Sequence, residues 1–91
     1  MIIRENDFQL TPIDESSLLF DLDLLYKVQP KGKEARFELK NAGYGLSLNN
    51  AIKKIAQYRV VNNHKDEAIS LLDYFKEFKK ELDSLDNIHK I

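Results

Sequence analysis

The 91-residue sequence contains no cysteine and no tryptophan, and it has only two prolines and three glycines. The absence of cysteine excludes disulfide bonds and thiolate metal sites, so packing alone must stabilise the fold. No run approaches the roughly 18 consecutive apolar residues that a membrane-spanning helix needs. The first residues also lack the basic segment and apolar segment of a signal peptide. We therefore expect a cytoplasmic domain that does not act on a membrane.

Charge is segregated along the chain, although the net charge is only -1. Residues 1–26 and the segment after residue 65 are acidic, whereas basic residues outnumber acidic ones nine to two in residues 27–65. The apolar content of 43% suffices for one core and argues against a disordered chain. We expect a single domain that covers residues 1–91. The basic middle segment either forms a one-sign surface or is neutralised by the acidic ends on folding.

Three segments alternate apolar and polar residues with the period of two that is typical of β-strands. They are residues 7–12, which form an edge strand ended by proline, residues 17–29 and residues 33–41. Residues 29–32, with the sequence Gln-Pro-Lys-Gly, form the predicted hairpin loop. The residues expected to face the core are Phe8, Leu10, Leu18, Phe20, Leu22, Leu24, Tyr26, Val28, Ala35, Phe37 and Leu39.

The apolar faces of the hairpin strands coincide only if paired residue numbers add up to an odd value, since a slip of one residue turns a strand over. A sum of 61 gives a short loop and places Lys27 opposite Glu34 and Asp21 opposite Lys40. A sum of 63 places Lys27 opposite Arg36, which is unfavourable for like charges. We therefore predict the register with a sum of 61.

Helical periodicity begins at Ser47, a good N-cap, and is predicted to end near Val61. A second helix is predicted from about Asp66, whose carboxylate suits a helix N-terminus. The expected fold class is α+β: a three-stranded antiparallel β-meander followed by two helices packed on one face. Steps of four and three residues define one apolar stripe on the second helix, formed by Leu71, Phe75, Phe78, Leu82 and Leu85.

No pattern for catalysis or for cofactor binding is present. The segment Gly43-Tyr44-Gly45 lacks the spacing of a phosphate-binding loop and is expected to connect a strand to a helix. The two histidines, His64 and His89, have no set of further metal ligands around them in the sequence. Paired acids such as Asp21 and Asp23 are expected on solvated faces. We predict a protein that is not an enzyme and binds no metal or cofactor.

Two surfaces are candidates for binding a protein. On the open face of the sheet, apolar Leu19 and Leu25 interrupt polar positions, and exposed apolar clusters often mark contacts. The far end of the second helix, with Leu85 and Ile88, extends past a small sheet. The full set of candidate residues is Leu19, Leu25, Lys27, Lys31, Lys33, Arg36, Lys40, Leu85 and Ile88.

Three kinds of partner remain open at this point. A protein is the favoured partner, and a homodimer is an alternative. Nucleic acid is the second alternative, bound through the basic hairpin of residues 27–40. Phe20, Tyr26 and Phe37 are expected to face inward, however, and then they cannot stack on bases.

Three stretches of the chain resemble small proteins without an assigned activity that are encoded by phages and prophages of low-GC Gram-positive bacteria. These are residues 27–37 (KVQPKGKEARF), residues 41–45 (NAGYG) and residues 51–55 (AIKKI). The resemblance implies an accessory factor that binds a host or phage protein inside a bacterial host. It implies no catalytic or binding residues.

Overall fold

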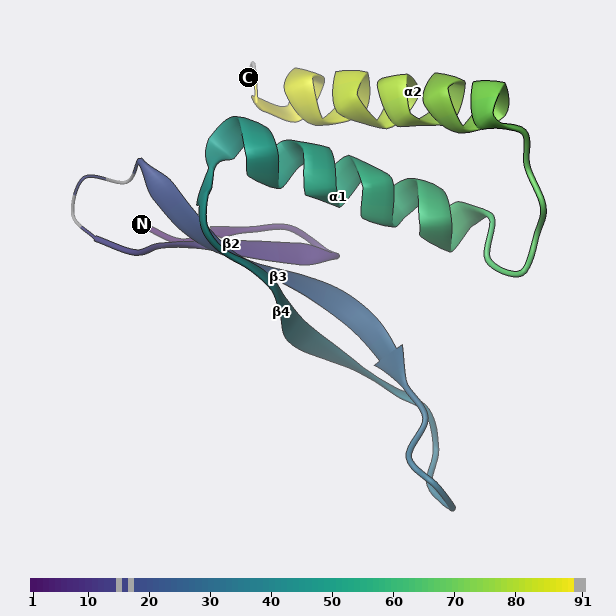
Figure 1. Cartoon of the computed structure of the whole chain (residues 1–91). Coiled ribbons are helices and arrows are strands. Elements are labelled where there is room, and N and C mark those ends of the chain that lie inside the picture. Colours follow the sequence, from purple (N-terminus) through teal and green to yellow (C-terminus); the bar gives the residue numbers. More distant parts are fainter. Residues whose placement is uncertain (15, 17, 90–91) are drawn as a thin grey trace. The chain divides into compact units, whose positions relative to one another are not determined.

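The computed structural model describes the backbone of residues 1–14, 16 and 18–89, and the side chains of these residues up to Leu85. Its elements are β1 (Ile3–Arg4), β2 (Phe8–Pro12), β3 (Leu19–Val28), β4 (Arg36–Ser47), α1 (Leu48–Asn63) and α2 (Leu71–His89). Figure 1 labels β2, β3, β4 and both helices. The α+β class is confirmed, with four described strands rather than three. The chain divides into two compact units, Met1–Ala51 and Ile52–Ile91. The single domain and the packing of both helices on one sheet face stay predictions.

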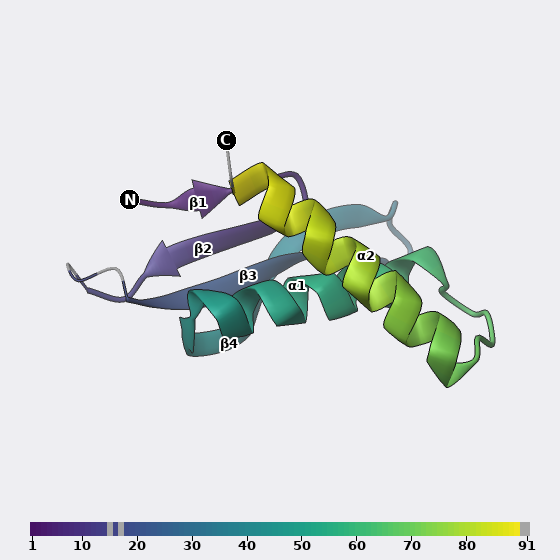
Figure 2. The same cartoon turned by 90° about the horizontal axis from the view of Figure 1, so that it is seen from above.

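The first unit contains an antiparallel sheet with the strand order β1-β2-β3-β4, visible in Figure 2. β2 was predicted as the edge strand, but β1 pairs with it and places Ile3 opposite Leu10. Two residues are too few for an alternating pattern, so periodicity cannot reveal β1. The predicted inward positions Phe8 and Leu10 are buried, and β2 ends at Pro12 as expected.

The predicted register of the β3–β4 hairpin is wrong. Lys27 lies opposite Phe37 rather than Glu34, and Lys40 lies opposite Leu24 rather than Asp21. Paired numbers near the tip add up to an even value, and directly opposed residues share a face. Even-numbered residues of β4 near the tip therefore share the face of Leu24. Phe37 lies on the opposite face, where sequence alternation predicted charged residues.

Two β-bulges interrupt the pairing of β3 with β4 near Leu22. One of them sets Tyr44 and Gly45 opposite the single residue Asp21, and Gly45 has a positive φ of 60°. The Gly45 N–H donates to Asp21 Oδ1 at 3.1 Å, which satisfies a backbone donor that the bulge removes from the ladder. The glycines thus lie within β4, and their predicted place in a strand-to-helix connection is wrong.

The buried face of the sheet is shorter than the sequence predicts. Phe20, Leu22 and Leu24 are buried as expected, but Tyr26 and Leu18 are exposed. Leu18 precedes the first residue of β3, and Tyr26 lies beyond the last residue of β3 that pairs with β2. The alternating pattern continues past the part of the sheet that has a core.

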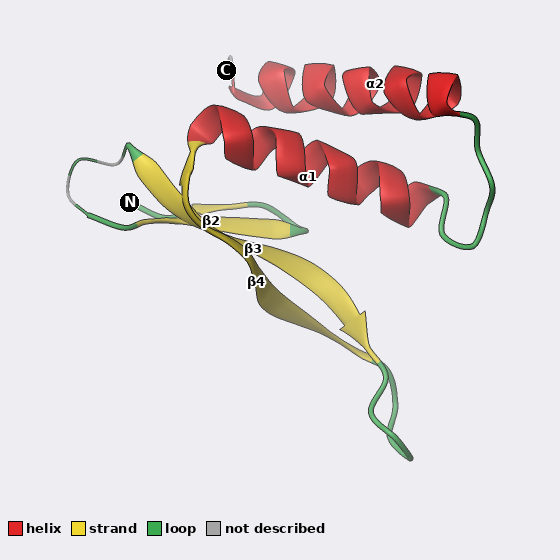
Figure 3. Cartoon of the chain, viewed as in Figure 1, coloured by secondary structure: helices red, strands yellow, loops and turns green. Residues whose placement is uncertain are grey.

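The second unit contains most of α1 and all of α2, the red ribbons of Figure 3. The predicted N-cap of α1 is confirmed, since the Asn50 N–H donates to Ser47 Oγ at 3.2 Å. Ile55, Ala56 and Val60 are buried and form one apolar stripe at helical spacing. α1 ends at Asn63, two residues beyond its predicted end.

α2 begins five residues later than predicted, at Leu71. Asp66 has a positive φ of 64° and cannot start a right-handed helix. Ser70 is the N-cap instead, because its Oγ accepts the Asp73 N–H at 3.1 Å. Exposure along the predicted stripe falls from 69% at Leu71 to 5% at Leu85.

The left-handed conformation of Gly45 leads to a stability prediction. Gly45→Ala is expected to lower the free energy of unfolding by about 1 kcal/mol, because a Cβ atom disfavours this conformation. Urea denaturation of the purified chain measures the change. Gly45→Asn is the matched control and should lose less, since asparagine tolerates positive φ. An alanine variant as stable as the wild type would contradict the bulge geometry.

Candidate protein-interaction site

The β3–β4 hairpin continues beyond the strand that flanks it in the sheet, as Figure 1 shows. β2 pairs with β3 from Phe20 to Leu24, and the Leu25 N–H still donates to Asp7 O at 2.9 Å. Among the described strands, residues 26–28 pair only with β4. The end of the hairpin is therefore a two-stranded ribbon. A ribbon of this kind has little stability of its own and leaves both of its faces open within the sheet.

One face of this ribbon is largely apolar, and we call it the Phe37 face. It consists of the cross-strand pair Leu25–Leu39 and the adjacent pair Lys27–Phe37. Phe37 is 67% exposed and Leu39 is 46% exposed. Opposed apolar side chains attract each other across strands, but two strands alone cannot remove them from water. The Phe37 face thus presents contiguous apolar surface to solvent.

The opposite face of the ribbon, the Tyr26 face, is mixed in character. Tyr26 lies opposite Glu38, and Val28 lies opposite Arg36. Arg36 Nε donates to Glu38 Oε1 at 2.6 Å, a charge-assisted contact between residues two apart on one strand. Both side chains are well exposed, so this ion pair adds little to stability. Its effect is to neutralise part of the positive charge on this face.

The structure separates the residues that the sequence predicts on the open sheet face. Leu25 and Lys27 belong to the Phe37 face, as expected. Arg36 lies on the Tyr26 face, and Lys40 lies opposite Leu24 on that same side of the sheet. The prediction that these two bases share a face with Leu25 is wrong, because the register is even instead of odd.

The hairpin tip matches the sequence prediction more closely. Lys31 and Lys33 lie in the exposed segment between β3 and β4, and Gly32 makes the turn with a φ of 76°. Five basic residues and two acidic residues lie between Lys27 and Lys40. The hairpin is thus locally basic in a chain of net charge -1, and its exposed tip carries this charge.

The other predicted contact residues are not part of this patch. Leu19 shares the side of Leu25 and is exposed, but six residues of extended strand place the two about 20 Å apart, with Asp21 and Asp23 between them. Leu85 was predicted to lie at the surface, but its side chain is buried, with 5% exposed. The Ile88 side chain lies outside the described residues.

Sequence reasoning missed Phe37 and Leu39 as surface residues. Their alternation with charged residues is the usual signal of a buried strand face. The signal that could have found them is strand length, because the five residues of β2 cannot flank all ten residues of β3. The part of the hairpin beyond β2 then has no neighbouring strand on that side to complete a core.

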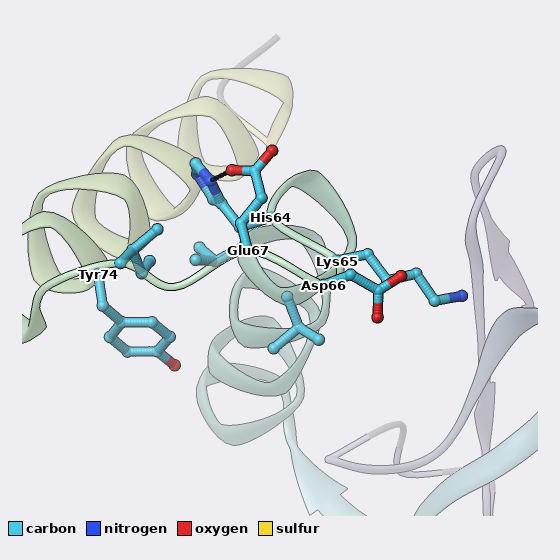
Figure 4. Close-up of a pocket in the computed structure, with 8 residues that line it drawn as sticks. His64, Lys65, Asp66, Glu67 and Tyr74 are labelled. Atoms are coloured by element: carbon cyan, nitrogen blue, oxygen red, sulfur yellow. Dashed lines mark hydrogen bonds and ion pairs between the residues drawn. The ribbon is translucent and has the colours of Figure 1, made fainter.

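The helical unit has a second feature of interest, a cavity of about 290 Å³ beside the α1–α2 loop, shown in Figure 4. His64 lines it and bridges two carboxylates: Nδ1 lies 3.1 Å from Glu67 Oε2, and Nε2 lies 3.4 Å from Glu77 Oε1 of α2. Both ring nitrogens can donate only in the imidazolium form. Contacts with Glu67 and then Glu77 accordingly raise the pKa of His64 above its usual 6.5. This arrangement ties the end of α1 to α2.

Known proteins and the chain's own chemistry give no further assignment. No protein-family model matches the chain, and neither a curated protein nor a solved structure is similar to it. Within the part of the chain that the structure describes, no group of three or more His, Cys, Asp or Glu residues is arranged to hold a metal ion. None of the described helices is both long and apolar enough to cross a membrane.

The His64 contacts lead to a pH prediction. A raised pKa in the folded state means that the ion pairs stabilise the chain fully below about pH 6.5, the reference pKa of histidine. That contribution disappears as the pH rises through the folded-state pKa. Glu77→Gln should lower the pKa of His64, and NMR titration of the ring protons measures it, with His64→Gln to assign the signal. Asp73, Lys76 and Lys80 line a second cavity that His64 and Glu77 also line, and these three charged residues are unchanged in both variants. An unchanged pKa in Glu77→Gln would contradict the contact.

Proposed function

We propose that this chain is a small non-enzymatic binding module that docks on another protein through its β3–β4 hairpin. The observation that carries the proposal is the exposed Phe37 face, where Leu25, Phe37 and Leu39 lie together on a ribbon only two strands wide. Contiguous exposed apolar surface with polar residues around it is typical of protein contacts. Central aromatic residues of this kind contribute much of the binding free energy at interfaces.

The energy available from this face is large enough to matter. Covering the exposed parts of Phe37 and Leu39 removes on the order of 200 Å² of apolar surface from water, worth roughly 5 kcal/mol at 25 cal/mol per Å². Part of this is offset by the loss of translational and rotational freedom on association. A moderate affinity is thus within reach before the rest of the interface is counted.

The basic tip gives the proposal a preferred partner chemistry. Lys31 and Lys33 precede the Phe37 face and would guide an acidic protein surface toward it, since complementary charge raises the association rate. The mechanism is occlusion or scaffolding. The resemblance to phage and prophage proteins supports an accessory factor that acts on a host or phage protein in the bacterial cytoplasm.

The non-enzymatic part of the proposal rests on the roles of the acidic side chains. Asp21 accepts the Gly45 N–H, and Glu38 accepts from Arg36, so each has a local structural partner. Glu77 and Glu67 contact His64 in a compact ion-pair cluster. These four acids thus have local structural contacts, which is the ordinary role of surface carboxylates.

A matched pair of substitutions tests the Phe37 face. The tagged chain should capture a stoichiometric protein from a lysate of a Gram-positive host, and this capture should survive nuclease. Phe37→Ser with Leu39→Ser should abolish it, whereas Tyr26→Ser on the opposite face should leave it nearly unchanged. Quantitative mass spectrometry of the captured fraction measures the difference. Equal loss in both variants, or retention in the first, would argue against this surface.

Nucleic acid is the second candidate, and one observation favours it. Phe37 and Tyr26 are exposed rather than inward, so the ribbon offers aromatic rings next to basic residues. A two-stranded ribbon also fits the major groove. We rank it second because Lys27 is the only basic residue on the aromatic Phe37 face. The remaining basic residues of the hairpin lie at the tip and on the other side of the ribbon.

Salt dependence separates the two candidates. If the hairpin binds nucleic acid, affinity for a duplex or single strand must fall steeply with salt, because phosphate contacts release counterions. Lys31→Glu with Lys33→Glu should then remove two such contacts and flatten the slope of log affinity against log salt by about 2. Fluorescence anisotropy with labelled DNA and RNA measures this. Docking on a protein through the Phe37 face predicts no measurable retention of either.

A further inference from the structure

β4 is the outer strand of the described sheet and pairs with β3 alone. Both bulges lie between Asn41 and Leu46, so the segment from Arg36 to Lys40 is regular and extended. Arg36, Phe37 and Leu39 are exposed. Natural edge strands are commonly protected by bulges, proline, short length or charged side chains. This segment has no bulge and no proline, and its only protection of this kind is the charge of Arg36, Glu38 and Lys40, which a partner strand of complementary charge would neutralise. It thus offers unpaired backbone groups to another strand.

The sequence around Phe37 is complementary to itself when read backwards. In Glu34-Ala35-Arg36-Phe37-Glu38-Leu39-Lys40, each charged residue has an opposite charge at the same distance on the other side of Phe37. We propose that a second copy of this chain pairs antiparallel with this edge, with Phe37 opposite Phe37 of the partner copy. Arg36 then lies opposite the partner's Glu38, and Glu34 opposite the partner's Lys40. Every charged residue of the segment faces an opposite charge.

The neighbouring registers are less favourable. A two-fold axis normal to the sheet pairs residues of the same face, so only registers centred on a residue are allowed. Centring on Arg36 or on Glu38 places like charges opposite each other. Centring on Leu39 keeps one kind of favourable pair, Glu38 with Lys40, but sets Phe37 opposite Asn41. Among these registers, the one centred on Phe37 places every charged residue of the segment opposite a residue of opposite charge.

The backbone geometry suits this pairing. Three of the paired positions, Arg36 to Glu38, already lie within β4, and four more are gained if the strand extends to Glu34, which would pair Ala35 with Leu39 and Glu34 with Lys40. Arg36 contacts Glu38 within its own strand, so pairing would join two such ion pairs into one cluster of four alternating charges. Antiparallel pairing about a single residue closes hydrogen bonds whichever way the Phe37 N–H points.

This inference goes beyond the proposed function and does not depend on it, because the strand edge and the Phe37 face are different surfaces. The two Phe37 faces would become neighbours on one side of a continuous sheet. The dimer would thus present twice the apolar surface to a further partner, and the β4 edge of each ribbon would be satisfied.

Charge reversal tests the partner and the register together. Sedimentation of the purified wild-type chain should show a concentration-dependent dimer. Arg36→Glu places a carboxylate opposite the partner's Glu38 at two symmetric positions and should weaken dimerisation by about tenfold. The double variant Arg36→Glu with Glu38→Arg restores opposite charges and should recover the wild-type affinity. A chain that stays monomeric at millimolar concentration, or a dimer that Arg36→Glu leaves unchanged, would overturn the proposal.

Cysteine cross-linking provides an independent readout, because the chain has no native cysteine. Phe37→Cys should form an intermolecular disulfide readily under mild oxidation, since opposed residues lie within disulfide range. Leu39→Cys is the matched control and should cross-link poorly, because the two cysteines at position 39 would be offset by four residues along the paired strands. Cross-linking at position 39 but not at 37 would exclude the Phe37 register. Partner capture by a monomeric Arg36→Glu variant would leave the proposed function standing without the dimer.

Discussion

The paired bulges of β4 are the constraint on which the rest of the sheet depends. Near α1, Leu46 lies opposite Phe20 on the buried face. Each bulge shifts the pairing by one residue and turns β4 over relative to β3. One bulge would have carried Phe37 to the face of Leu22, but two bulges return it to the open face. The Asp21 carboxylate and the left-handed Gly45 stabilise this arrangement. The face on which Phe37 lies is therefore determined by residues at the bulge, which are not close to Phe37 along the strand.

The even register also sorts the charges of the hairpin. It places Arg36 next to Glu38 on the Tyr26 face and leaves Lys27 as the only basic residue on the Phe37 face. A single hairpin thus separates three properties: an apolar face, a mixed face and a basic tip. An edge with alternating charge lies at right angles to both faces. The proposed docking on a protein and the proposed pairing with a second copy would use different parts of this hairpin, so one would not block the other.

The sequence predicts the elements well and their junctions poorly. Periodicity identified three of the four strands and both helices, and the Ser47 cap was correct. The start of α2 was missed because Asp66 and Ser70 are both good caps by composition, and only the positive φ of Asp66 decides between them. The register failed because alternation reports that residues share a face, not which face. Phe37 was therefore assigned to the core, although the hairpin extends beyond the part of the sheet that has one.

Strand length is the physical basis of both proposals for this hairpin. β4 has 12 residues and β2 has five, so the tip is two strands wide over its last pairs. A two-stranded ribbon is marginal in water, and its apolar pairs gain stability only when a further strand or surface covers them. Binding would thus order the ribbon as well as bury Phe37. The exposed apolar residues that two strands cannot bury are those on which the proposed docking rests, and the regular edge from Arg36 to Lys40 is where the proposed second copy would add a third strand.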